Sequence, residues 1–246
     1  MIKRPPNRGP FLFASGLILF DLWAMCGRLA VTLPNDAMAQ LFDAAPANDL
    51  PGTPNFNVCP TTQIPVVLAG TERRHYAPMR WGFIPSWYQS PTDGPLLINA
   101  RAETIAEKPA FREACRQRRC IIPASGFYEW TKDPVGNRLP WYIFRSDGAP
   151  LAFAAVWQDW RRGDLAYRCC AIVTTGANTS LAEIHHRMPV VLEPKDWGKW
   201  LGEEGHGAAP LMRAADEDLL SFHRVDPAVN SNRAAGPELI EVIEPF

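Results

Sequence analysis

The chain has 246 residues, of which 47% are hydrophobic and 21% are charged, and its formal net charge is -1. These values are ordinary for a folded globular protein, and they exclude a disordered, collagen-like or coiled-coil chain. A nearly neutral chain has no overall basic field, so any binding to a polyanion must depend on where individual arginines lie.

In chain order, the first question is where the functional protein begins. A few basic residues precede the apolar stretch 11–20, which superficially resembles a secretory signal. The stretch is short for a membrane span, and the residues just before Cys26 fit no signal cleavage site. We therefore expect residues 1–24 to be an extension from a misassigned start codon or a removed leader. Residues 25–246 are expected to form one domain.

Beyond residue 25, short apolar runs are separated by turn residues. Strands are expected at 26–32, 64–68, 74–84, 120–131, 139–145, 151–160 and 167–174. Helices are expected at 35–42, 110–119, 197–201 and 210–220, and the capping box Ser180-x-x-Glu183 predicts a further short helix. Because strands and helices do not alternate as βαβ units, the pattern predicts an α+β domain with a largely antiparallel sheet.

Cys26 differs from the other cysteines because of its position. If translation starts at Met25, removal of that methionine exposes a 1,2-aminothiol whose α-amine has a pKa of about 7.7–8.0. The amine can form an imine with an aldehyde, and the thiolate can then close on the imine carbon to give a thiazolidine. The alternative is that Cys26 simply begins a buried strand. The cysteines show no zinc-like spacing, so we expect no metal.

A carboxylate lies inside the aromatic segment Gly126-Phe127-Tyr128-Glu129-Trp130. On a strand, Glu129 faces the same side as Phe127 and the opposite side from its two neighbours. If that side is a partly apolar cleft, burial raises the pKa of Glu129 and suits it to acid–base catalysis. The alternative is an exposed strand glutamate.

The segment His185-His186-Arg187-Met188-Pro189 is the densest polar cluster. Adjacent histidines cannot face one site on a regular helix, so they are poor joint metal ligands. One histidine could donate a hydrogen bond to a phosphate or a sugar oxygen. The alternative is that a histidine and an arginine compensate the dipole at the end of a helix.

Basic and aromatic residues are mixed over 80–87, a combination that stacks single-stranded bases and holds phosphates, although core packing explains it equally well. Farther along, Asn99, Arg101 and Glu103 would share one face of an extended segment. The sequence contains no motif typical of nucleotide-binding, serine-hydrolase or zincin proteins.

Together these motifs resemble the SOS response-associated peptidase family, the abasic-site processing proteins. Each motif alone is weak, but the ordered set is specific. The matching segments, in the family's order, are Met25-Cys26-Gly27-Arg28, Asn57-Val58-Cys59-Pro60-Thr61, residues 80–87, residues 99–104, residues 123–130 and residues 185–189.

The resemblance implies a sensor that cross-links covalently to abasic sites in single-stranded DNA, as part of the DNA damage response. On this pattern Cys26 is the nucleophile and Asn99 positions the cysteine and the sugar. Glu129 is the acid–base group, and His185 holds the sugar or its phosphate and assists release. Lyase activity and self-cleaving peptidase activity are further implications. Residues 1–24 depart from the pattern, because they block the α-amine of Cys26.

The resemblance also implies that Arg28, Trp81, Arg101 and Arg187 contact DNA. It implies a bent, barrel-like, largely antiparallel sheet flanked by short helices. We expect a cytoplasmic monomer that needs no cofactor and no membrane. Two other functions stay open: a general Cys/His peptidase, and a non-catalytic module that binds single-stranded DNA.

Overall fold

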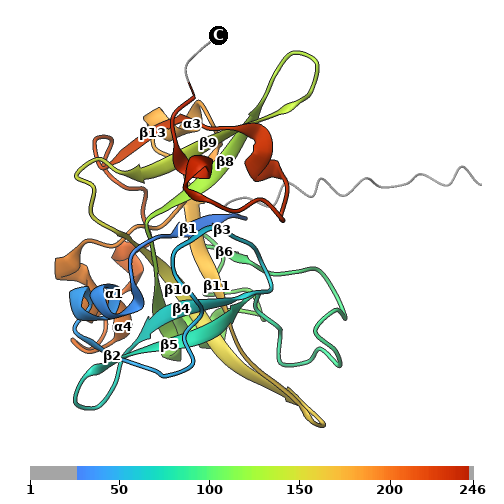
Figure 1. Ribbon diagram of the computed structural model, residues 1–246. Coiled ribbons are helices and arrows are strands. Elements are labelled where there is room, and N and C mark those ends of the chain that lie inside the picture. The colour runs from blue at the N-terminus through green and yellow to red at the C-terminus, as the bar shows by residue number, and fades with distance from the viewer. Residues whose placement is uncertain (1–26, 244–246) are drawn as a thin grey trace, which may run out of the picture.

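The computed structural model describes residues 27–243, which fold into two β-sheets with short helices around them (Figure 1). The five-stranded sheet has the order β13-β9-β8-β1-β3 and is antiparallel throughout. Its strands are β1 (Leu29–Val31), β3 (Asn55–Val58), β8 (Gly126–Lys132), β9 (Arg138–Arg145) and β13 (Leu220–Arg224).

The larger sheet has the order β12-β11-β10-β7-β4-β5-β2, and β11 also pairs with β5. This second pairing closes β11, β10, β7, β4 and β5 into a small barrel, which confirms the expected barrel-like α+β architecture. The strands of this sheet are β2 (Ala44–Pro46), β4 (Gln63–Leu68), β5 (Arg74–Trp81), β7 (Arg119–Ala124), β10 (Leu151–Arg162), β11 (Leu165–Gly176) and β12 (Arg187–Pro189), with β6 (Asn99–Arg101) paired to β11.

The helices are short and lie at the edges of the sheets, with α1 and α4 together on one side of the barrel (Figure 1). None of the described helices is long and apolar enough to cross a membrane. The α-helices are α1 (Asn35–Leu41), α2 (Arg112–Gln117), α3 (Thr179–Ala182) and α4 (Trp197–Leu201), and the 3-10 helices are η1 (Pro194–Asp196), η2 (Ala209–Leu211), η3 (Pro227–Asn230) and η4 (Pro237–Ile240).

The two largest hydrophobic clusters of the described residues lie between the sheets and under the helices. The first cluster joins the two sheets. In it, Phe127 of the five-stranded sheet contacts Phe153 of the barrel in an edge-to-face arrangement, with ring centroids 5.7 Å apart. The other lies under the helices, where Phe42 stacks on Trp197 of α4 at 4.2 Å. Since β10 and β11 contribute alternate residues to both clusters, their central parts are apolar on both faces.

Two predicted helices differ in the structure. The N-cap of α3 is Asn178, whose side chain accepts a hydrogen bond from Leu181, so the predicted capping box at Ser180 is wrong. The role predicted for Glu183 is taken by Glu217, which accepts from the amides of Thr179 and Ser180. The predicted helix 210–220 is also wrong, because the chain forms only η2 and a turn before β13 begins at Leu220.

Candidate active site

Glu129 lies in the middle of β8 and is only 2% exposed, so the alternative of an exposed strand glutamate is wrong. Its cross-strand neighbour is Trp141 of β9. Phe127 packs in the cluster that joins the sheets, whereas Tyr128 and Trp130 pack in a separate cluster on the other face. The strand alternation predicted from the sequence is confirmed, and it directs the carboxylate toward the apolar side shared by the two sheets.

Few ionisable side chains in 27–243 are as buried as Glu129. Among the buried side chains of this part of the chain, Arg145 and His185 are the other two that are charged or titrate near neutral pH, and each is 9% exposed. Arg145 is explained by ion pairs to Asp147 at 2.8 Å and Glu193 at 2.9 Å. The family resemblance predicts that Glu129 is the acid–base group and that His185 holds the sugar or its phosphate. Buried titratable groups mark functional sites more often than exposed ones do.

His185 follows α3 directly, since its amide donates to the carbonyl of Leu181 at 2.9 Å. The amide of Arg187 donates to Nδ1 of His185 at 3.1 Å, and this hydrogen bond fixes the orientation of the imidazole. The other ring nitrogen, Nε2, makes no hydrogen bond to the Arg187 backbone. Burial lowers the pKa of His185 below its usual value of 6.5. At neutral pH the ring is therefore uncharged and able to exchange a proton.

Asn99 and Arg101 lie in β6, which runs parallel to β11 with Ile172 opposite Asn99 and Thr174 opposite Arg101. On the antiparallel side, β12 pairs Thr174 with Pro189. The end of β11 is thus flanked by the two motifs that contain Asn99 and Arg187, although 88 positions separate those two residues in the sequence (187 − 99). Arg101 is exposed, as a residue that contacts DNA must be.

The residues beside the predicted catalytic groups share one core. Ile98 precedes Asn99, Ile184 precedes His185, and Phe127 lies two positions before Glu129; all three pack in the cluster that joins the sheets. The three predicted catalytic positions are therefore anchored on a common apolar base. Rigid support of this kind is what a preorganised site requires.

Arg187 forms a bidentate ion pair with Glu103, with N···O distances of 2.7 and 2.9 Å. It also donates to the carbonyl of Thr174 at 2.7 Å. The Arg187 guanidinium lowers the pKa of Glu103 to about 2. The sequence motifs contained both residues, but nothing in their spacing indicated that they pair. The DNA contact expected of Arg187 stays a prediction, and the structure adds a second role for it in joining β11 to the loop after β6.

Trp81 has no exposed surface and donates its indole N–H to the carbonyl of Ile98 at 3.1 Å. A fully buried indole offers no face for a base, so the expected DNA contact does not fit this side chain, and core packing explains it. The exposed aromatic residue of the same motif is Trp87, which is 50% exposed. Its loop is held by Trp160, whose indole N–H donates to the carbonyl of Tyr88 at 3.1 Å.

The remaining predicted residues lie at the start of the chain. Cys26 is outside the described residues. Two residues later, Arg28 lies next to β8, since its carbonyl accepts from the amide of Tyr128 at 3.0 Å. Its guanidinium bonds to Asn57 and to the carbonyl of Val229, so it is engaged within the protein.

Arg138 of β9 is a further charged side chain beside β8 that the sequence motifs do not include. Its guanidinium lies over the ring of Trp130 at 4.4 Å from the centroid. Burial lowers the pKa of Arg138, Arg28 lowers it further, and Glu129 raises it. Arg138 and Glu129 therefore influence each other electrostatically, although the Arg138 guanidinium packs on Trp130, on the other face of β8.

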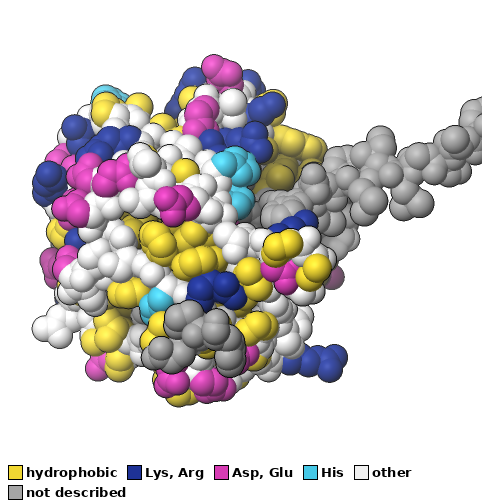
Figure 2. All heavy atoms as spheres, turned by 90° about the horizontal axis from the view of Figure 1, so that it is seen from above, with side chains coloured by type: hydrophobic (Ala, Val, Ile, Leu, Met, Phe, Trp, Pro, Cys, Tyr) yellow, Lys and Arg dark blue, Asp and Glu magenta, His cyan; other side chains and the backbone are white. Residues whose placement is uncertain are grey.

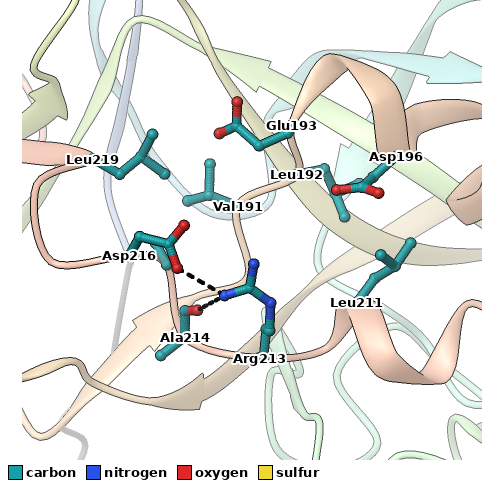
Figure 3. A pocket seen from close by; sticks show the side chains of 10 residues that line it. Val191, Leu192, Glu193, Asp196, Leu211, Arg213, Ala214, Asp216 and Leu219 are labelled. Atoms are coloured by element: carbon teal, nitrogen blue, oxygen red, sulfur yellow. Dashed lines mark hydrogen bonds and ion pairs between the residues drawn. The ribbon is translucent and has the colours of Figure 1, made fainter.

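Charge on the surface is mixed. Figure 2 shows Lys and Arg side chains interspersed with Asp and Glu on one face, without a continuous basic field. A small cavity of about 30 Å³ lies among Val191, Leu192, Leu211 and Leu219, with Arg213 bonded to Asp216 at its rim (Figure 3). That volume suits a water molecule rather than an organic ligand, and none of its lining residues belongs to the predicted site. In residues 27–243 no group of three His, Cys, Asp or Glu side chains is arranged to hold a metal ion.

A small barrel joined to a second antiparallel sheet, with short helices around them, defines a mostly β protein, and its buried side chains include one glutamate and one histidine. The chain belongs to the SOS response associated peptidase (SRAP) family, whose sequence profile it matches over residues 25–232.

Its relatives include abasic site processing protein YedK of Escherichia coli, 33% identical over 228 residues that cover 89% of this chain and 100% of that protein. Abasic site processing protein YoqW of Bacillus subtilis is 33% identical, with 88% of this chain and 99% of that protein covered. A crystal structure of a Bacteroides thetaiotaomicron protein has the same fold, with a TM-score of 0.78 at 24% identity, covering 89% of this chain and 100% of that chain.

Proposed function

We propose that this protein captures abasic sites in single-stranded DNA by forming a thiazolidine with Cys26, once Cys26 is the N-terminal residue. The supporting observation is the pairing of β1 with β8, in which Leu29 lies opposite Phe127 and Ala30 opposite Gly126. The amide of Tyr128 donates to the carbonyl of Arg28, and the same register continued by one more residue would set Gly27, the residue after Cys26, opposite Glu129. The aminothiol and the buried carboxylate thus belong to adjoining stretches of chain.

The chemistry needs no outside reagent. The abasic deoxyribose opens to an aldehyde, whose carbon is attacked by the α-amine; loss of water gives an imine. The thiol sulfur then adds to the imine carbon while its proton goes to the nitrogen, so that aldehyde and aminothiol give thiazolidine and one water. Proton transfers at the sugar oxygen and at the departing water are assigned to Glu129. Neutral His185 donates to or accepts from the sugar or its phosphate, and Asn99 orients the reacting groups.

Two further activities follow from the same groups. An imine acidifies the C–H bond on the adjacent carbon of the sugar. Loss of that proton and departure of the 3′ phosphate would give lyase activity.

Residues 1–24 block the α-amine of Cys26, and we propose that the working protein lacks them, either because translation begins at Met25 or because the chain removes its own leader. The family match begins at residue 25, which supports this start.

The test compares three proteins by mass spectrometry after incubation with single-stranded DNA that contains one abasic site. Protein that begins at Cys26 should give a heat-stable adduct whose mass equals protein plus DNA minus one water. Protein retaining residues 1–25, and the Cys26→Ala variant, should give none. An adduct whose mass still includes residues 1–25 would overturn the thiazolidine, whereas an adduct of the trimmed mass would show that the chain had first lost those residues. If the extended protein also cleaved an unrelated peptide, the activity would be that of a general Cys/His peptidase.

A further inference from the structure

The start of β1 is tied to a segment near the other end of the chain. Arg28 donates through Nη1 to the side-chain oxygen of Asn57 and, at 3.0 Å, to the carbonyl of Val229. Asn57 is 8% exposed, and its amide group donates to the carbonyls of Ser231 at 3.0 Å and Ala234 at 2.6 Å. Two side chains therefore connect three separate parts of the chain: the residues before β1, strand β3, and residues 229–234.

Packing around these hydrogen bonds supports the connection. Tyr128 donates its hydroxyl to the carbonyl of Phe56 at 2.7 Å, and Trp130 donates its indole N–H to Asn230 at 2.6 Å. Val229 is fully buried in the cluster that contains both aromatic residues. In Figure 1 the C-terminal segment lies against β1 and β8. Arg28 and Asn57 thus belong to the sheet face opposite the one that Glu129 occupies.

The hydrogen bonds of Arg28 and Asn57 matter for the start of the strand because β1 is only three residues long. The first residues of a chain fray unless other elements hold them. Strand pairing holds Leu29 and Ala30, and the Arg28 carbonyl accepts from the amide of Tyr128 at 3.0 Å. The Arg28 side chain adds a second connection at the start of this strand. For the amine and thiol to meet a sugar beside Glu129, the terminus must stay within bond-forming range, and an error of about 1 Å costs on the order of 100-fold in rate.

We propose that Arg28 and Asn57 act as positioning residues, forming a clasp through which residues 229–234 hold the reactive N-terminus beside Glu129. This inference rests on the proposed function and changes the role of Arg28 that the sequence predicted. The Arg28 guanidinium donates to Asn57 and Val229 within the protein. On this proposal it positions the N-terminus and does not bind a DNA phosphate.

The test uses protein that begins at Cys26 and the variants Arg28→Ala, Arg28→Lys and Asn57→Ala. Arg213→Ala is the matched control, because it removes one positive charge from an exposed ion pair outside the clasp. Three quantities are measured: the rate constant of adduct formation at saturating abasic DNA, the Kd for intact single-stranded DNA as a function of salt, and the labelling of the terminal aminothiol by 2-cyanobenzothiazole. Hydrogen exchange of the β1 amides reports independently on fraying.

Arg28→Ala and Asn57→Ala should each slow adduct formation by about 10- to 100-fold. The Kd and its salt dependence should equal those of Arg213→Ala, the aminothiol should label at least as fast as in the wild type, and the β1 amides should exchange faster. The double variant should be no slower than either single one, because the two residues act as one unit.

A weaker Kd together with a salt slope reduced by about one for Arg28→Ala would instead make Arg28 a phosphate contact and overturn the clasp. Adduct formation at the wild-type rate in Asn57→Ala would overturn it as well. If Arg28→Ala does not fold, Arg28→Lys and Asn57→Ala decide the question. Absence of any adduct from the wild-type protein would contradict the proposed function itself, which is a different result from a wild-type adduct that the variants leave unchanged.

Discussion

Arg187 and Glu103 face each other through two parallel hydrogen bonds, although 84 positions separate them in the chain. The Arg187 side chain is only 12% exposed, whereas Glu103 is 48% exposed, so the arginine is the buried partner. This pair connects the two motifs on either side of Thr174.

Replacing Glu103 should therefore destabilise the protein. Glu103→Gln keeps the shape but removes the charge, and we expect the free energy of unfolding to fall by about 1–2 kcal/mol, because a solvent-accessible carboxylate is partly screened. Urea denaturation measures this. Asp159→Asn, which breaks the exposed pair between Asp159 and Arg168, is the control and should change stability by less than about 1 kcal/mol. Equal losses in the two variants would contradict the structural role of the pair.

The same pair predicts a difference in acid stability. The folded pKa of Glu103 is lowered to about 2, so its contribution is present above its unfolded pKa of about 4.3 and is lost as the pH falls toward 2. The wild type should lose more stability than Glu103→Gln between these two pH values, and the two curves should converge at the acid end. Denaturation at a series of pH values checks this, and parallel curves would contradict it.

Glu129→Gln should separate chemistry from folding. The substitution preserves size inside a buried strand but removes the proton-transfer group, so adduct formation should slow by about 100-fold or more. The Kd for intact single-stranded DNA should not change. The measurement is a quench time course on protein that begins at Cys26, with Glu72→Gln, an exposed glutamate in the turn before β5, as the carboxylate control. An unchanged rate would remove Glu129 from the mechanism.

His185 should titrate at a pH below the ordinary range for histidine, because burial lowers its pKa. Protonation then favours the unfolded chain, so the contribution of neutral His185 to stability is complete above its unfolded pKa of about 6.5 and is lost as the pH falls through the folded pKa. NMR titration of the imidazole, assigned with His185→Gln, measures the midpoint. A midpoint at or above 6.5 would contradict a buried neutral ring.

The two tryptophans of the segment 80–87 should behave in opposite ways. Trp87→Ala should weaken binding of single-stranded DNA by about 1–3 kcal/mol if a base stacks on its exposed ring. Trp81→Phe should lower the stability of the fold and leave DNA affinity unchanged, because Trp81 is buried. Fluorescence anisotropy and urea denaturation distinguish the two. A loss of DNA affinity in Trp81→Phe without loss of stability would restore the role first expected of Trp81.

Local patterns in the sequence predicted much of the fold and part of the site. The alternation along β8 correctly indicated which face Glu129 occupies, because strand periodicity is a local property. Short elements such as β12 carry too few residues for a periodic signal, and the parallel pairing of β6 with β11 depends on long-range contacts. The burial of Trp81 and the partners of Arg28 could not be predicted for the same reason: both depend on residues that are distant in the chain.

The partner of Arg28 at Val229 follows it by 201 positions. During synthesis the N-terminus leaves the ribosome long before residues 229–234 exist. On the proposed function, a nascent chain would carry its aminothiol before the partners of Arg28 and Asn57 are made. Cross-linking to an abasic site would then be coupled to completion of the chain, and a protein truncated before residue 229 would be a poor cross-linking agent.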